Sequence, residues 1–418
     1  MRVKWKNKGL CPQCNNRGQS PHALISDIKT YFNSTDDGGV GYRMGVEFQI
    51  DALFSKVIHP YDLDHEVLFH KFKEAVTFAF KSNKLTKADT ILSRFESSCD
   101  ESRKTLEKYY LLTSMSLNTN CIPKRRSLNG CVISFYREIP VKYKNARTKL
   151  ITKHKELDLS EQDNYVFVII SVNASDVKTA FKNSIGALDT IRALLQLNFK
   201  KSIQMFSPKD EHKYSSNSIL SLGQVHTLHL ENGAQAWGNI WYEPQFKNKK
   251  TIRITNFELA ESSLTEFIKR INKSPFSEHL LGSLRSYINA LDHIEQEFRF
   301  MKLWSVIEKI VKSDETKMIV KRVSFFYENR AVTKETLNSL RQARNINVHA
   351  GVKPFNVEMK NFNLCLYIDD MLKFFINNPF GYDELKKIID FISLPTELQS
   401  IDQQLKNLKF VKEFIGKG

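Results

Sequence analysis

The sequence has few cysteines and no long apolar segment. Six cysteines, eleven prolines and sixteen glycines are spread over 418 residues. So few cysteines in so long a chain do not form a disulfide scaffold, which favours a reducing compartment. No apolar segment approaches the roughly 20 residues of a membrane span, and none follows the basic N-terminus as in a secretory signal. We therefore expect a cytoplasmic protein with no membrane partner.

Acidic residues are also scarce relative to basic ones. The chain has 62 Lys and Arg against 46 Asp and Glu, which gives a formal net charge of +16. Ten basic residues and a single glutamate lie between 124 and 155. Such a cluster attracts polyanions and predicts an RNA-binding surface, although a solvated lysine-rich surface has the same composition. The predicted RNA-binding residues are Lys124, Arg125, Arg126, Lys142, Lys144, Arg147 and Lys149.

The spacing of apolar residues predicts an α+β fold with three regions. Helical and strand-like segments alternate in the first two regions, and the last region is helical. We predict a mixed α/β N-terminal region over 1–158, a possible sensing or RNA-binding part. An α+β middle region is expected over 159–262, and an all-α helical bundle over 263–418.

The same spacing predicts individual elements of the first two regions. The expected helices lie at 66–84, from 87 onward, and at 177–197. The expected strands lie at 109–117, 131–136, 166–172, 225–230 and 237–241. Asn232-Gly233 between the last two strands is a typical hairpin turn.

Helix-capping residues divide the C-terminal region into several helices. Ser274 and Pro275 predict a helix start, with Ser as N-cap and Pro at the first helical position. Thr333 is the predicted N-cap of the fourth helix, which Gly351 and Pro354 should stop. We expect a small bundle with short connections.

Arg344 and His349 lie five residues apart at the end of this fourth helix. RNA cleavage without a metal requires a permanent cation to hold the phosphate and an imidazole to move protons near neutral pH. The spacing alone is weak evidence, since Arg17 and His22 have it too. Glycine and proline separate that second pair, so no rigid helix would hold it.

Helix geometry separates the two side chains of the C-terminal pair. Five residues on an α-helix turn through about 140° beyond a full circle, which places Arg344 and His349 on neighbouring faces. A two-fold dimer in which two such helices meet would combine two Arg and two His in one site. The motif therefore predicts a homodimer.

The segment Arg344-Asn345-Ile-Asn-Val-His349 resembles the Arg-x4-6-His motif of HEPN domains, in which a polar residue commonly follows the Arg. The preceding helices, at 284–291 and 300–308, are also similar to that family, and the resemblance covers roughly residues 265 to 380. It implies a dimeric, metal-independent endoribonuclease, often a toxin or antiviral effector that cuts host or phage RNA. A phage or regulatory protein is then a possible trigger.

The motif residues suit this chemistry by type. His349 is assigned proton transfer, and a helix C-terminus stabilises the positive charge that a general acid needs. Arg344 is assigned phosphate binding, because its planar fork matches two phosphate oxygens. Asn345 would orient the phosphate or the imidazole, and Arg341 would add a second phosphate contact. Basic residues are, however, favoured in the last turn of any helix.

Glu308 is a supporting candidate, because it lies on the apolar stripe of the second bundle helix. A carboxylate there is costly unless it is paired. It would then pair with Arg344 or orient His349, or it would lie at the edge of the stripe with its head in water.

Cys11 and Cys14 resemble half of a zinc knuckle, but a structural zinc site needs four ligands. His22, Cys121 and Cys131 would have to complete it. His226 and His229 differ by three along a strand and so point to opposite faces, which disfavours a shared metal. Trp237 and Trp241 share a strand face and would either stack on bases or pack in the core. No phosphate-binding glycine loop is present, and we expect no cofactor.

These patterns together predict a cytoplasmic endoribonuclease that leaves 2′,3′-cyclic phosphate ends and uses a composite dimer site. Two alternatives stay open. A catalytically silent HEPN-like bundle would bind RNA or a partner, or the bundle would dimerise a sensor or scaffold.

Overall fold

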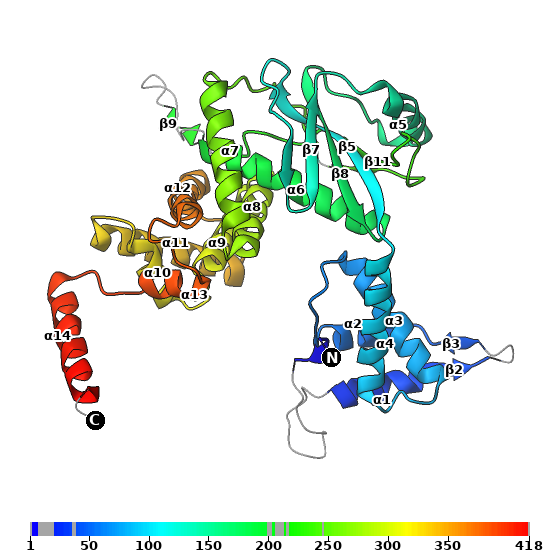
Figure 1. Cartoon of the computed structure of the whole chain (residues 1–418), viewed down its shortest axis with the longest axis horizontal. Coiled ribbons are helices and arrows are strands. Elements are labelled where there is room, and N and C mark those ends of the chain that lie inside the picture. Colours follow the sequence, from blue (N-terminus) through cyan, green and yellow to red (C-terminus); the bar gives the residue numbers. More distant parts are fainter. Residues whose placement is uncertain are drawn as a thin grey trace.

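The computed structural model in Figure 1 confirms an α+β protein with many helices and a six-stranded antiparallel sheet. It describes residues 2–6, 21–35, 39–198, 203–204, 213–214, 217–244 and 246–416. Within these ranges no helix is long and apolar enough to cross a membrane.

The N-terminal part is a helical unit with a core of its own. Ile50, Phe72 and Phe95 are buried together there, in a cluster separate from the other buried residues of the chain. One small hairpin and one pair of strands distant in the sequence accompany the helices. The helices are α1 Pro21–Tyr31, α2 Val46–Phe54, α3 His65–Lys81 and α4 Ala88–Lys104. The short strands are β1 Lys4–Trp5 with β4 Val57–Ile58, and β2 Phe32–Ser34 with β3 Val40–Tyr42.

The main sheet has the strand order β12-β11-β5-β8-β7-β6, and all its pairs are antiparallel. Its strands are β5 Glu107–Asn118, β6 Arg126–Leu128, β7 Cys131–Tyr136, β8 Tyr165–Ala174, β11 Val225–His229 and β12 Trp241–Tyr242. A further pair, β9 Ile203–Gln204 and β10 Lys213–Tyr214, lies apart from it. The expected strands at 131–136 and 166–172 are confirmed.

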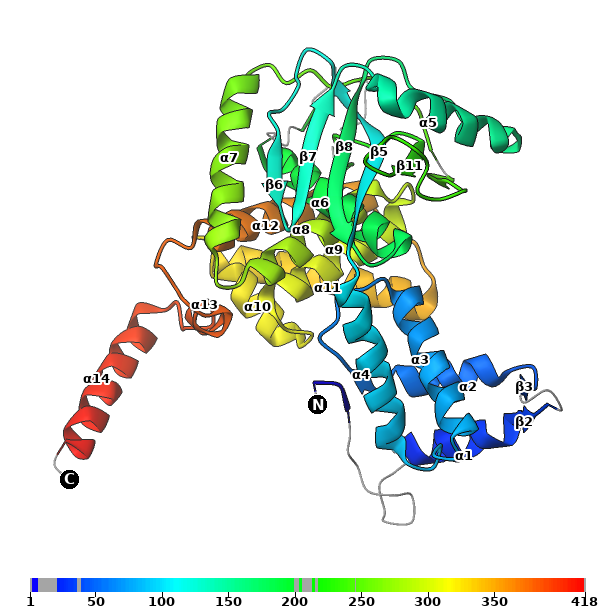
Figure 2. The same ribbon diagram turned by 45° about the vertical axis from the view of Figure 1, so that its right-hand side comes forward.

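Alternating residues of the strands face two different helices. Leu111 and Ile170 belong to the large core that contains α6, Val177–Asn198. Leu112 and Ile169 instead pack with Tyr143 of α5, Val141–Lys153. Figure 2 shows α6 behind the sheet and α5 beside β11. Because successive side chains of a strand point to opposite faces of the sheet, α6 covers one face and α5 covers the other.

Helix α6 joins the sheet to the C-terminal bundle. Its buried residues lie on all sides, because it packs against both β8 and α8. The bundle consists of α7 Phe257–Lys273, α8 Ser277–Asp292, α9 Gln296–Val311, α10 Thr316–Ser324, α11 Arg330–Ala350, α12 Val357–Asn377 and α13 Leu385–Phe391. The last helix, α14 Leu398–Ile415, has no buried residue and stands away from the body in both views.

Two predicted helix starts are wrong. Helix α8 begins at Ser277, and Ser274 instead follows α7 as its C-cap. Helix α11 begins at Arg330, where the side chain of Asn329 accepts a hydrogen bond from the backbone N–H of Val332. Asn329 is as good an N-cap as Thr333 and lies four residues earlier.

The predicted boundary at 158 is also wrong. Strand β5 of the first predicted region pairs along its length with β8 of the second, so 158 falls between two strands of one sheet. The separate N-terminal core ends at Cys99, and the core of the sheet continues through α6 into the bundle. The buried clusters thus divide the described chain near 105.

Candidate functional site

The C-terminal half of α11 projects from the bundle. Thr333, Leu337 and Leu340 are the buried residues of this helix, and none of the ten residues after Leu340 is buried. Gly351 ends the helix in the left-handed conformation with φ of 64°, which glycine adopts without strain. The packing thus leaves the last turns of α11 at the surface, with Ala343 packed against the edge of the core, and Gly351 sets where the helix stops.

Arg344 and His349 both lie in these last turns. Arg344 is partly buried, and its Nη1 donates to Oδ1 of Asn345 at 3.3 Å. His349 is exposed one turn later, and Arg341 is exposed one turn earlier. No hydrogen bond joins Arg344 to His349 within this described helix, as the angle of about 140° between them requires. The helix therefore carries both groups without a hydrogen bond between them.

Glu308 does not support this pair. Its Oε1 accepts a hydrogen bond from Nε1 of Trp304 at 2.8 Å, one turn earlier on α9. The expectation that Glu308 pairs with Arg344 or orients His349 is wrong, because its nearest donor is a neighbour on its own helix. The buried indole N–H needs an acceptor, and Glu308 supplies it.

Apolar side chains surround the end of α11. Ile346 and Val348 are about half exposed, and Val352 and Phe355 of the following loop are 54% and 82% exposed. An ion pair of 2.7 Å between Lys353 and Glu297 connects the loop to α9. The site thus has an Arg, a His and an amide beside an exposed apolar rim.

The predicted RNA-binding residues divide into two groups. Arg147 is 1% exposed and donates to Glu161, to the carbonyl oxygens of Leu112 and Val225, and to Oγ1 of Thr227. Its prediction as an RNA contact is wrong, since every nitrogen of the guanidinium is used inside the protein. Arg126 is mostly buried in an ion pair with Glu261.

The other basic residues stay on the surface. Those exposed are Lys124, Arg125, Lys142, Lys144 and Lys149. Arg125 and Lys142 line one cavity of about 200 Å³ on the outer face of the sheet, together with Tyr110, Tyr136 and Tyr143. The Lys142 ammonium lies 4.7 Å from the centre of the Tyr143 ring and 5.2 Å from that of Tyr110. The fold thus brings two cations far apart in the sequence to one aromatic surface.

The candidate metal ligands do not form a site where they are described. Cys11 and Cys14 lie outside the described residues. Cys121 and Cys131 are buried, and burial raises the pKa of the Cys131 thiol to about 12. In the described part of the chain no three His, Cys, Asp or Glu side chains gather as metal ligands.

His226 and His229 have structural roles. Nδ1 of His226 lies 2.7 Å from Oγ1 of Thr113, and its Nε2 lies 3.2 Å from Glu243. His229 contacts Thr227 and the carbonyl of Gly233, and burial lowers its pKa to about 4. The Trp241 ring stacks on Phe181 at 4.1 Å and contacts Trp237 at 4.2 Å. These rings pack against other side chains of the protein.

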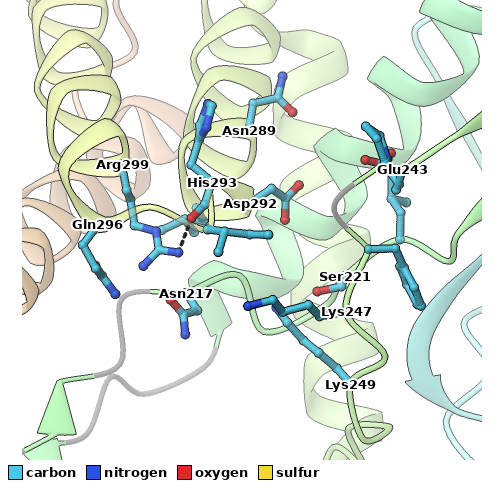
Figure 3. Close-up of a pocket in the computed structure, with 15 residues that line it drawn as sticks. Asn217, Ser221, Glu243, Lys247, Lys249, Asn289, Asp292, His293, Gln296 and Arg299 are labelled. Atoms are coloured by element: carbon cyan, nitrogen blue, oxygen red, sulfur yellow. Dashed lines mark hydrogen bonds between the residues drawn. The ribbon is translucent and has the colours of Figure 1, made fainter.

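A pocket between the sheet and the bundle was missed by sequence analysis (Figure 3). It measures about 500 Å³ and is lined by Lys247, Lys249 and Arg299, among others. None of these three residues was a predicted site residue. No local pattern relates them, because the pocket forms only when α8 and α9 pack beside the end of the sheet.

Comparisons with protein-family models, with curated proteins and with solved structures found no match to this chain.

Proposed function

We propose that this protein is a metal-independent endoribonuclease whose site is formed by the exposed ends of two α11 helices. The observation that supports this best is the placement of Arg344 and His349 on the free last turns of α11. If this Arg and this His were buried or ion-paired, their role would be to stabilise the fold. Here His349 is exposed and Arg344 is partly exposed, and no ion pair within the described chain involves either of them.

The proposed reaction is attack of a ribose 2′-OH on the adjacent phosphate. The P–O bond to the 5′-oxygen of the next nucleotide breaks, and a 2′,3′-cyclic phosphate forms. His349 protonates the leaving oxygen, and the second histidine of the dimer accepts the 2′-OH proton. Arg344 stabilises the charge that develops on the phosphate oxygens. Asn345, which accepts a hydrogen bond from Arg344, holds that guanidinium in position.

The dimer is part of the proposal. Arg344 and His349 of one chain do not touch, and a second copy would bring its own pair to the same phosphate. Ile346, Val348, Val352 and Phe355 supply the exposed apolar rim that such an interface would bury. The cations Arg125 and Lys142 beside Tyr110 would bind the rest of the RNA, because phosphate contacts and stacking both suit single strands.

In the cell, this activity would make the protein a cytoplasmic toxin or antiviral-defence effector, released by a phage or regulatory trigger. A catalytically silent RNA-binding module is the second candidate. It is favoured by the basic, aromatic surface of the sheet, which needs no contribution from α11. In that case RNA would bind in a salt-dependent manner and stay intact.

The test is RNA cleavage by wild type, Arg344→Ala and His349→Ala with EDTA present. His70→Ala is a matched control, because His70 is also an exposed helix histidine and lies on α3. We expect wild type and the control to cut RNA, and both α11 variants to lose at least a hundredfold in rate. Intact RNA that still binds to wild type would favour the second candidate.

A further inference from the structure

The pocket between the sheet and the bundle has walls from four segments of the chain. The segment before β11 contributes Asn217, and the segment after β12 contributes Lys247 and Lys249. The end of α8 and the turn after it contribute Asp292 and His293, and α9 contributes Arg299. Figure 3 shows the labelled lysines across the pocket from α9. Its volume of about 500 Å³ is that of a small-molecule site, since such sites measure roughly 300–1,000 Å³.

Arg299 is the most unusual residue of this pocket. It is 3% exposed, and its Nη2 donates to the carbonyl oxygen of His293. Its Nε and Nη1 are buried without a hydrogen-bond partner, and no ion pair involves Arg299 in the described chain. Burial lowers the pKa of this guanidinium. A buried cation without an anion is costly, and a planar fork with free donors matches a phosphate.

The other cations of the pocket also lack carboxylate partners among the described residues. Lys249 places its Nζ 3.4 Å from the carbonyl oxygen of Ser218. Desolvation lowers the pKa of Lys249, and the positive charges of Arg192 and Arg299 lower it further, while the negative charge of Asp292 acts in the opposite direction. Lys247 lies beside it on the exposed rim. The Arg299 guanidinium and the two lysines thus line one pocket, and an anion bound there would lie among three cations.

The acidic residues of the lining are already used by other groups. Asp292 accepts from Nη2 of the buried Arg192 at 2.7 and 2.9 Å. Glu243 lies 3.2 Å from Nε2 of His226, and this contact lowers the pKa of Glu243. Neither carboxylate is paired with the pocket cations. The net charge that the pocket presents to a ligand is therefore positive.

The rest of the lining suits a ligand that carries a ring in addition to its phosphate. Leu222, Phe246 and Ile294 provide apolar surface, and Asn217 and Asn289 provide amide donors and acceptors. A phosphate group alone would fill only a small part of the volume. An apolar wall with a few polar groups is the usual surrounding of a bound base.

We propose that this pocket binds a phosphate-bearing ligand of mononucleotide size, with its phosphate at Arg299, Lys247 and Lys249. The site is separate from Arg344 and His349 and does not depend on ribonuclease activity. Its phosphate would be held by the fork of Arg299 from the bundle and by the lysines from the segment after β12.

The experiment is isothermal titration of the full chain with AMP, adenosine and inorganic phosphate. The variant reverses the charge of both exposed lysines, Lys247→Glu with Lys249→Glu. Lys250→Glu is the matched control, because Lys250 is an exposed neighbour that does not line the pocket. We expect saturable binding of AMP, at least tenfold tighter than that of adenosine or phosphate. The double variant should lose at least tenfold in affinity, and the control should stay within twofold of wild type.

A second variant tests Arg299 itself. Arg299→Gln should lose AMP binding while its circular dichroism spectrum stays that of wild type. If Arg299→Gln unfolds, the lysine variant decides the outcome alone. The proposal is overturned if AMP gives no saturable heat, if adenosine or phosphate binds as tightly as AMP, or if the lysine variant binds AMP like the control.

Discussion

At the scale of residues, the same amino acid has opposite roles in this chain. Arg147 lies in the basic cluster of the sequence and Arg344 in the Arg-His motif, whereas no sequence pattern marked Arg299. Arg147 has every donor satisfied in the core, Arg299 has two free donors in a pocket, and Arg344 lies on a free helix end. Only the residues that pack around each one distinguish them. Those partners come from segments distant in the sequence, so local patterns do not reveal them.

The buried hydrogen bonds of Arg147 predict a large loss of stability. Arg147→Ala leaves Glu161 and three further acceptors without their donor, and we expect it to lower the free energy of unfolding by about 3–5 kcal/mol. Urea denaturation measures this. Arg125→Ala, at an exposed position, should change stability by less than about 0.5 kcal/mol. Equal effects of the two variants would contradict the buried role.

The buried His229 predicts a pH dependence of stability. Its folded pKa of about 4 lies below the ordinary value of 6.5, so below pH 6.5 the unfolded chain binds a proton that the folded chain excludes. Stability should therefore fall with pH between about 6.5 and 4, by up to about 1.4 kcal/mol per pH unit. Wild type should lose stability relative to His229→Gln across this range in denaturation experiments. A constant difference would show that His229 titrates normally.

At the scale of elements, apolar spacing located most helices and strands, and capping residues located their ends less well. The expected strand at 131–136 matches β7, and the expected helix at 177–197 is one residue short of α6. Two cap predictions failed for different reasons: α11 has an earlier good cap residue, and α8 begins after Phe276 without a side-chain cap. Asn329 precedes Thr333, and Ser274 ends one helix three residues before the next begins.

The cap of α11 can be tested directly. Asn329→Ala removes the acceptor for the N–H of Val332, and we expect a loss of about 1 kcal/mol in the free energy of unfolding. Ser339→Ala is a control at an exposed position of the same helix. An effect of Asn329→Ala no larger than that of the control in thermal or urea denaturation would contradict the assignment of the cap.

At the scale of the whole molecule, the N-terminal helical unit has its own core, whereas the sheet and the bundle share one. The sequence predicted the helical bundle and the end of α11, because both depend on local spacing and on Gly351. It did not predict the shared core or the pocket beside it. Those depend on α6 lying between the sheet and α8, a contact that no periodicity encodes.

The exposed rim around α11 predicts a dimer that a charge would disrupt. Phe355→Asp places a carboxylate in the apolar surface that the second copy should bury, so we expect monomers by analytical ultracentrifugation and at least a tenfold loss of RNA cleavage. Phe48→Asp, at an exposed apolar residue of α2, should leave both unchanged. A wild type that is monomeric yet cuts RNA would contradict the composite site.

The ends of the RNA fragments test the central claim most directly. Wild type should cut RNA in EDTA and leave 2′,3′-cyclic phosphates that mass spectrometry identifies, and His349→Ala should leave RNA intact. Fragments with other ends, or equal cleavage by His349→Ala, would contradict the assignment of Arg344 and His349 as the catalytic pair.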